Sequence, residues 1–197
     1  DRDKRIAAAA DKTGIYINAY GVDGSKIDLY LGFLREHGLN SIVVDFKDDY
    51  GIVCYDTELE LPYELDAVRP YFDARRLIEK AHDAGIYVIA RILVFKDRAM
   101  YRFNNHEYAA WVRRQNWAWA NLFTFEDEET GKTGYYQKEH WVDPFAPFVW
   151  RYNIAIAEEL QELGVDEIQF DYIRFPTDGD LSAIMYRHRR EGMERQD

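Results

Sequence analysis

The chain has 197 residues, of which 47% are hydrophobic and 16% aromatic, and it carries a formal net charge of −11. Its length and apolar content are those of one globular domain with a sizeable core. The net negative charge argues against nucleic acids and anionic membranes as partners. No apolar run reaches the roughly 20 residues of a membrane span. The single Cys54 excludes an internal disulfide framework.

The two ends of the chain differ in composition from its middle. Residues 1–12 are polar and alanine-rich, which is typical of a linker, and we expect the domain itself to occupy residues 13–197. The chain begins with neither Met nor a signal-peptide pattern, so we expect it to be excised from a longer protein. Residues 186–197 form a charged run that predicts a helix.

Four runs rich in Ile, Val, Phe and Tyr predict strands. They cover Gly14–Tyr20, Ser41–Lys47, Tyr87–Phe95 and Glu167–Pro176. All four are mostly apolar at both odd and even positions, as strands covered on both faces are.

Amphipathic segments between these strands predict helices with recognisable start and stop residues. The start and stop residues are Ser25 and Gly38, Asp73 and Gly85, and Pro147 and Gly164. Ser25 and Asp28 together resemble a capping box. The order is therefore strand, helix, strand, helix, strand, long insertion, helix, strand, and we expect parallel strands with right-handed crossovers.

Two architectures fit this order: an open doubly wound sheet, or the first half of a (βα)₈ barrel. The segment Ala19–Gly24 lacks the G-x-G-x-x-G pattern of a dinucleotide-binding sheet. Polar residues recur near the strand ends instead, which is typical of a barrel. A full barrel needs about 250 residues, so we expect this chain to hold four of its eight βα units.

Three groups of segments resemble a known family. They are Val43–Gly51, then Ala90–Asp97, and last the set Trp141–Pro144, Tyr152–Ala157 and Asp166–Pro176. From about Lys12 to Asp180 the chain is similar to the putative glycoside hydrolase domain family, domain of unknown function 4015. This resemblance implies a (βα)₈ TIM barrel related to α-amylase-like glycosidases, truncated here to about its first four units.

The resemblance also implies a role for Asp171, because the fourth-strand aspartate of related glycosidases acts as nucleophile or base. A carboxylate at a strand end can stabilise an oxocarbenium-like centre. The alternative is a structural salt bridge with Arg174 or Arg91. Arg91 is costly to bury unpaired, so we expect it to pair with Asp45 or Asp171, either orienting them or contacting substrate.

Asp45 and Lys47 are two apart on the second strand, so we expect both side chains on one face. They would either line a sugar-binding floor or form an internal ion pair. Tyr20 is a further candidate for contact with sugar at a strand end. Asp143 is either an N-cap or a substrate contact. For Arg174 the alternatives are contact with substrate, support of Asp171, or a plain surface position.

All five tryptophans lie in the long insertion or just beyond it. Aromatic faces stack on the apolar faces of pyranose rings, and long loops carry function. Trp117, Trp119 and Trp141 are therefore candidate sugar contacts, and the alternative is that they pack the insertion onto the barrel.

No signal for a metal or a cofactor is found. The five histidines are scattered without zinc-ligand spacing, and Asp48 or Asp49 lacks a supporting histidine cluster. Cys54 has no nearby base and no serine nucleophile motif is present. We expect neither cofactor nor metal.

The sequence thus supports a glycoside hydrolase domain that acts on a polysaccharide or glycan, with Asp171 and Asp45 catalytic and the acid supplied by the missing half. One alternative is a non-catalytic carbohydrate-binding barrel of the cell envelope, and a weaker one is an open α/β enzyme acting on a small acidic substrate. A polysaccharide substrate favours an extracytoplasmic or cell-envelope location. As an isolated half barrel, the chain is expected to dimerise, aggregate or be inactive, because its edge strands are unpaired.

Overall fold

The computed structural model describes residues 2–24 and 26–194 and divides into two compact units. The first, here called the sheet unit, contains the residues up to Asp48 together with Ile52–Ile92 and Ile154–Asp171. The second, here called the hairpin unit, contains Asp49–Gly51, Leu93–Asn153 and the residues from Tyr172 onward. Among its described residues, the chain has no helix long and apolar enough to cross a membrane.

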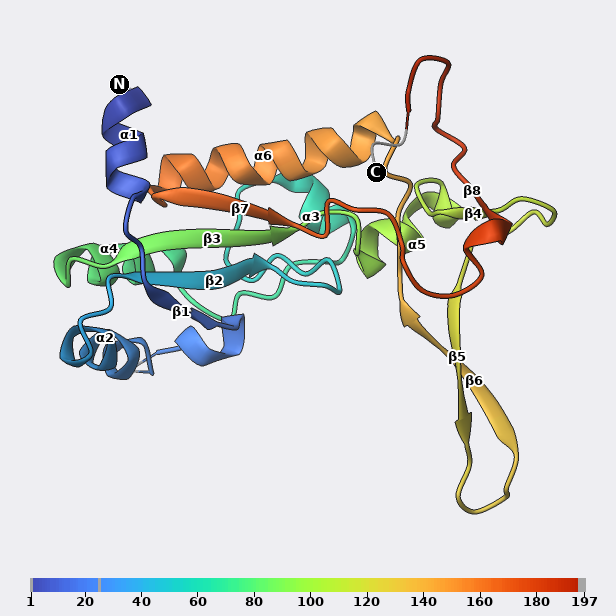
Figure 1. Cartoon of the computed structure of the whole chain (residues 1–197), viewed down its shortest axis with the longest axis horizontal. Coiled ribbons are helices and arrows are strands. Elements are labelled where there is room, and N and C mark those ends of the chain that lie inside the picture. The colour runs from blue at the N-terminus through green and yellow to red at the C-terminus, as the bar shows by residue number, and fades with distance from the viewer. Residues whose placement is uncertain (1, 25, 195–197) are drawn as a thin grey trace. The chain divides into compact units, whose positions relative to one another are not determined.

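The sheet unit is a mixed α/β fold built on one four-stranded sheet (Figure 1). Its strands are β1 (Gly14–Ile17), β2 (Ser41–Lys47), β3 (Tyr87–Leu93) and β7 (Glu167–Asp171). They lie in the order β1-β2-β3-β7, so each strand lies beside the next of the four in the chain. Ser41 is paired with Gly14 on one side and Tyr87 on the other, and both pairings are parallel.

All four predicted strands are present, but three end earlier than the sequence predicts. β1 stops at Ile17, because Ala19–Val22 forms the 3₁₀ helix η1 and the Asn18 side chain accepts a hydrogen bond from the Gly21 N–H at 2.9 Å. β7 stops at Asp171, because Tyr172 has a φ of +51° and extended backbone cannot continue through it.

Three of the helices in the sheet unit lie within the predicted start and stop residues. The helices with residues in this unit are α1 (Arg2–Ala9), α2 (Lys26–Glu36), α3 (Glu60–Glu64), α4 (Ala74–Asp83) and α6 (Pro147–Leu163), the last shared with the hairpin unit. Asp73 caps α4 as predicted, since its side chain accepts a hydrogen bond from the Arg76 N–H at 3.0 Å. The predicted capping box at Ser25 lies outside the described residues.

The segment expected to be a linker, residues 1–12, contains helix α1, and its residues 3–11 are exposed to solvent.

The core of the sheet unit lies between the sheet and the helices. Its fully buried members include Leu34, Ile42, Val44, Ala81, Val88, Ala90, Ile156 and Leu160. Two-sided burial was predicted for all four strands, but it holds only for the middle strands β2 and β3. One of the four residues of β1 is buried and none of the five of β7 is, because these two strands are the edges of the sheet.

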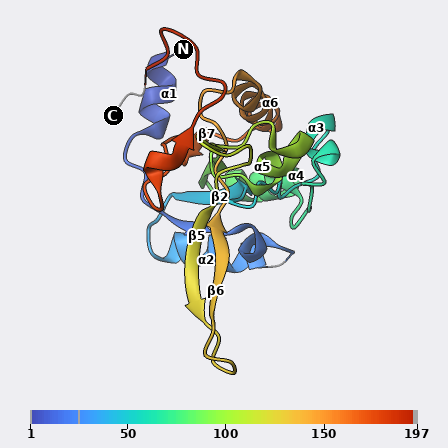
Figure 2. The same ribbon diagram turned by 90° about the vertical axis from the view of Figure 1, so that its right-hand side faces the viewer.

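The hairpin unit holds most of the long insertion. Its elements are α5 (Arg98–His106), β4 (Trp111–Val112), β5 (Asn121–Glu126), β6 (Thr133–Glu139), η2 (Leu181–Ala183) and β8 (Ile184–Met185). β5 and β6 form an antiparallel two-stranded ribbon, and the two strands lie side by side in both views (Figure 1, Figure 2). Asp97 caps α5, and the helical geometry of α5 is broken at Phe103, where ψ is 141°.

A helix was predicted over residues 186–197, and the described part of this segment, up to 194, has none. Tertiary contacts hold it in turns instead. The Arg187 guanidinium lies 3.5 Å from the ring centroid of Trp111 and donates hydrogen bonds to the carbonyls of His106 and Glu107. The His188 N–H donates to Asp143 at 2.8 Å, and together these contacts outweigh helix propensity.

Candidate functional site

The carboxyl ends of the sheet strands bring together one arginine, two aspartates and one tyrosine, here called the Arg91 cluster. Tyr16 comes from β1, Asp45 from β2, Arg91 from β3 and Asp171 from β7, so each strand contributes one residue. Asp45 and Arg91 are direct partners in the parallel pairing of β2 with β3. The order of the strands therefore places a cation between two anions.

Arg91 binds both carboxylates of the cluster. Its Nη1 lies 2.7 Å from Asp45 Oδ1, and its Nε and Nη2 lie 2.8 and 2.7 Å from Asp171 Oδ2. The Tyr16 hydroxyl donates a short hydrogen bond to Asp45 Oδ2, and the guanidinium lies 5.5 Å from the Tyr16 ring centroid. Both oxygens of Asp45 are thus engaged within the cluster.

Burial and charge act in opposite directions on Arg91. Desolvation alone would lower the pKa of the guanidinium, but hydrogen bonds and charges from Asp45 and Asp171 outweigh it and raise that pKa. The side chain of Asp45 is 9% exposed and that of Asp171 is 36% exposed. Asp171 is thus the carboxylate of the pair with more surface open to a reacting molecule.

Lys47 and Tyr20, two further candidates, also lie in the sheet unit. Lys47 ends β2 and is completely buried, and a shift in strand register between Asp45 and Lys47 interrupts the alternation on which the one-face prediction rests. Tyr20 is exposed, and its ring lies 4.3 Å from that of Tyr71, whose hydroxyl accepts a hydrogen bond from the Tyr20 hydroxyl at 3.1 Å. This hydrogen bond and burial raise the pKa of Tyr71 to about 12.

The three candidate tryptophans fall into two groups. Trp119 and Trp141 are buried in the core of the hairpin unit with Ala110 and Ile184. The Trp119 Nε1–H donates to the Asp180 carbonyl at 3.1 Å. Both residues are therefore part of the hairpin unit's own core. Trp117, by contrast, is 58% exposed and stays a candidate for contact with a ligand.

Asp143 and Arg174 have partners within the hairpin unit. Asp143 is completely buried and accepts hydrogen bonds from the Phe145 and His188 N–H groups at 2.9 and 2.8 Å. Burial raises its pKa, although these two bonds oppose the effect. The Arg174 guanidinium lies over the rings of Trp141 and Tyr172, 5.1 and 5.2 Å from their centroids. The contacts of Asp143 are those of a structural carboxylate that ties a turn to the C-terminal segment.

A second charged group, missed by the sequence reasoning, surrounds Lys96 in the hairpin unit. Lys96 Nζ lies 3.0 Å from Asp49 and 3.3 Å from Glu139. Burial alone would raise the pKa of Glu139, but the Trp141 indole N–H at 2.9 Å and the Lys96 charge hold it below its usual range. Lys96 lies inside Ala90–Asp97, a segment that resembles the family, and this resemblance was the only indication in the sequence that Lys96 could belong to a site.

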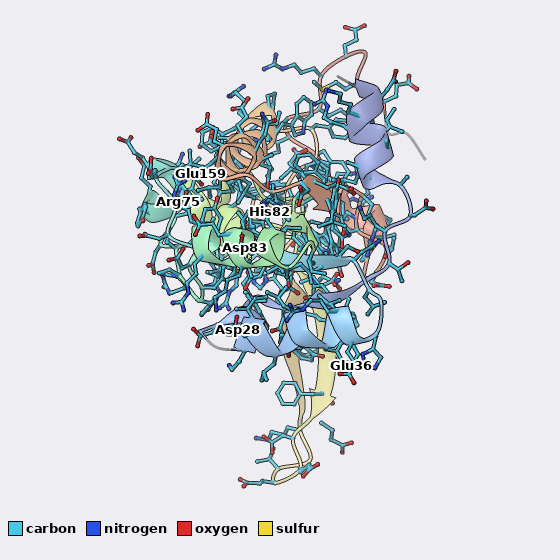
Figure 3. The ribbon with its side chains drawn as sticks, turned by 90° about the vertical axis from the view of Figure 1, so that its left-hand side faces the viewer. Asp28, Glu36, Arg75, His82, Asp83 and Glu159 are labelled. Atoms are coloured by element: carbon cyan, nitrogen blue, oxygen red, sulfur yellow. The ribbon has the colours of Figure 1, made fainter. Side chains whose placement is uncertain are left out.

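The sheet unit also has a cavity of about 600 Å³. Arg75 and Glu159 lie on its wall, and Figure 3 shows them on α4 and α6. None of the predicted site residues lines it, and the contacts of Glu159 hold a loop rather than an open site. In the described part of the chain, no three His, Cys, Asp or Glu side chains are grouped to hold a metal.

Comparison with solved structures supports the fold. A hypothetical protein from Ruminiclostridium thermocellum ATCC 27405 is 28% identical with a TM-score of 0.73, and the match covers 92% of this chain and 85% of that one. Flavobacterium johnsoniae chitobiase is 15% identical with a TM-score of 0.54, covering 82% of this chain and 24% of the enzyme. A GH31 alpha-xylosidase from a soil metagenome is 17% identical with a TM-score of 0.51, covering 88% and 24%.

The likeness to the chitobiase and the xylosidase shows a shared fold alone, and this chain spans about a quarter of the length of each. A search of curated protein sequences finds no significant match. A family model described as "Putative glycosyl hydrolase domain" matches residues 14–197, which is nearly the whole chain and includes all four strands of the parallel sheet. The chain therefore belongs to this putative glycosyl hydrolase domain family, domain of unknown function 4015.

Proposed function

We propose that this chain forms the first four βα units of a (βα)₈ barrel that hydrolyses O-glycosidic bonds in a polysaccharide or glycan. The strand order β1-β2-β3-β7 supports the barrel, because it advances in one direction without reversal. A doubly wound sheet reverses its order at a switch point, where its ligand binds. The family's description supports the chemistry, and the likeness to two glycosidases supports the fold alone.

The observation that carries this proposal is the Arg91 cluster at the carboxyl ends of the strands. Active sites of (βα)₈ enzymes lie at this end of the barrel. Asp171 is the proposed nucleophile or base, since it is the more exposed carboxylate and the guanidinium of Arg91 favours its ionised form. Asp45 is proposed to fix Arg91 from the other side, which sets the position of Asp171.

The proposed mechanism needs a second carboxyl group that protonates the leaving oxygen. Both aspartates of the cluster contact the Arg91 guanidinium and are proposed for other roles. We therefore assign the acid to one of the later strands of the proposed barrel, beyond β7. A separation of about 5 Å from Asp171 would give retention of configuration, and roughly 6.5–9.5 Å would give inversion.

The test is cleavage of a panel of glycans by the full-length protein and by its Asp171→Asn variant. Asparagine keeps the shape of the side chain but cannot attack or accept a proton, so turnover should fall by about a thousandfold or more. Glu167→Gln is the matched control, because Glu167 begins the same strand at its opposite end, and it should keep normal turnover. Unchanged turnover in Asp171→Asn would contradict the proposal.

A second candidate function is carbohydrate binding without cleavage. It is favoured by the 58% exposure of Trp117 and by an Arg91 cluster in which both carboxylates already contact the arginine. Binding of a glycan by the wild-type protein and by Asp171→Asn alike, with no cleavage by either, would establish this second function.

A further inference from the structure

The hairpin unit contains a cavity of about 570 Å³ that no predicted mechanism uses. This volume lies within the usual range of small-molecule sites, roughly 300–1,000 Å³. Residues of α5, of the β4–β5 connection, of β6 and of the position just after β6 line it. They include Tyr101, Arg102, His106, Trp117, Gln137 and His140.

The inner wall of the cavity is rigid and aromatic. Tyr101 is buried, and the rings of His106 and His140 meet it edge-on with centroid distances of 5.0 and 5.1 Å. The Tyr101 hydroxyl donates to the Trp119 carbonyl at 3.0 Å, which fixes the ring. His106 Nδ1 carries the proton that it donates to the Tyr101 carbonyl at 2.8 Å, so its Nε2 is the nitrogen left for a ligand.

Arg102 gives the cavity wall a positive charge, although the whole chain carries a formal net charge of −11. No carboxylate is among the described residues that line it. Arg98 and Arg102 are four apart on α5 and therefore share one face of the helix, where like charges repel. Neither has an ion-pair partner among the described residues, and there the buried Nε of Arg98 lacks a hydrogen bond.

The positive charges around the cavity also affect the pKa of His140. Burial, together with the nearby charges of Arg98, Arg102 and His106, lowers the pKa of His140 to about 4. The histidine is therefore neutral near pH 7, and Arg102 is the principal charge on the cavity wall. A bound anion would relieve the repulsion between the two arginines.

Trp117 forms an open wall beside this positive charge. It is 58% exposed, and its carbonyl accepts a hydrogen bond from the Val112 N–H at 3.0 Å, which fixes its backbone. An exposed indole face fits the apolar face of a pyranose, while Gln137 and His106 offer polar groups for hydroxyls. An aromatic wall with an unpaired cation matches a sugar that also carries a negative charge.

We propose that this cavity is a binding subsite for an acidic sugar, a pyranose that bears a carboxylate or a sulfate ester. Arg102 binds the anionic group and Trp117 stacks on the ring. The ligand class rests on the proposed carbohydrate function, but the subsite needs no cleavage. A glycan recognised here contains uronic acid or sulfated residues.

The test compares probes that differ in one group. Glucuronate and glucose differ only at C6, glucose 6-sulfate replaces the carboxylate with a sulfate ester, and inorganic sulfate supplies charge without a ring. Binding is measured by NMR titration on the Asp171→Asn protein, so that no probe is consumed. Glucuronate or glucose 6-sulfate should bind about tenfold more tightly than glucose or sulfate, and the tighter of the two identifies the anion.

Two variants locate the binding. Arg102→Gln should weaken the charged sugar about tenfold, equal to about 1.4 kcal/mol, and leave glucose unchanged. Trp117→Ala should weaken both sugars. The matched control is Arg35→Gln, which removes an exposed helical arginine from the sheet unit and should change nothing.

Three outcomes would overturn the inference: equal binding of glucuronate, glucose 6-sulfate and glucose; inorganic sulfate binding as tightly as the charged sugar; or an unchanged affinity in Arg102→Gln. The proposed function can fail separately. If the charged sugar binds at Arg102 but no glycan is cleaved, the subsite is established and the hydrolase is not. If neutral glycans are cleaved and the charged sugar is not preferred, the hydrolase is established and the acidic-sugar subsite is not.

Discussion

At the scale of single residues, the candidate site depends on Arg91. One guanidinium makes three short contacts with two carboxylates, and its side chain is only 18% exposed. Without the cation, Asp45 and Asp171 would remain close together, partly buried and negatively charged. Removing one member of a buried ion pair destabilises a protein by more than the pair itself stabilises it, because the remaining charge stays buried without a partner.

Replacement of Arg91 by leucine is therefore expected to lower the free energy of unfolding by about 3 kcal/mol. Arg91→Lys should lower the free energy of unfolding by less, about 1–2 kcal/mol. The lysine ammonium keeps the positive charge, but it lacks the separate nitrogens with which the guanidinium contacts both carboxylates. Urea denaturation of the two variants beside wild type measures both values. Arg35→Leu, a change at an exposed arginine of α2, should cost less than 1 kcal/mol.

A loss in Arg91→Leu no larger than that in Arg35→Leu would show that the cluster does not stabilise the sheet. The site would then have to be explained without an organising arginine.

At the scale of elements, helix α6 holds the long connection between β2 and α4 through one carboxylate. Glu159 accepts hydrogen bonds from the Thr57 hydroxyl and the Glu58 N–H, each at 2.6 Å, and from the Tyr55 hydroxyl. Tyr55 and Thr57 are buried, so their donors have no solvent to replace this acceptor. Figure 3 shows Glu159 on α6.

We expect Glu159→Ala to lower the free energy of unfolding by about 3 kcal/mol, because two buried hydroxyls and one N–H lose a charged acceptor. Glu158→Ala changes the exposed neighbour on the same helix and should cost less than 0.5 kcal/mol. Thermal or urea unfolding of the pair measures the difference. Equal effects of the two substitutions would show that Glu159 is not what anchors the connection.

The sequence predicts the strands and most helix boundaries correctly because these signals are local. Runs rich in Ile, Val, Phe and Tyr mark where each strand begins, although only β2 and β3 are buried on both faces as predicted. The Asp73 cap depends only on the neighbouring residues of its own helix. The β5–β6 hairpin is missed, because it is exposed on most of its length and lacks the alternation of a half-buried strand. The charged segment from residue 186 is wrongly predicted, since distant contacts through Arg187 and His188 fix its backbone.

The candidate site is only partly readable from the sequence. The pairing of Arg91 with Asp45 and Asp171 follows from polar residues at neighbouring strand ends, whereas Tyr16 carries no such signal. Burial separates Trp119 and Trp141 from Trp117, and no spacing in the sequence distinguishes these three indoles. Which aromatic residues face a ligand is a property of the packed insertion, which its composition does not determine.

At the scale of the whole molecule, the two edges of the sheet differ from its middle. Six of the seven residues of β2 are buried, whereas none of the five residues of β7 is. Tyr16 on β1 and Phe170 on β7 are 54% and 42% exposed. Edge strands with apolar side chains and unpaired backbone groups bind further strands, whether from the rest of a barrel or from another copy of the chain.

We therefore expect this chain of 197 residues, expressed alone, to self-associate and to lack activity. Light scattering coupled to size-exclusion chromatography should give a mass above the monomer value of 23.3 kDa that rises with concentration. Phe170→Lys should shift the mass toward the monomer, because a charge on an edge strand opposes further pairing. Phe33→Lys, a change on the exposed face of α2, should not. A monomer that unfolds in one cooperative transition would show that the sheet edges need no partner, and would remove the strongest physical reason for placing the remaining half of a barrel beside β7.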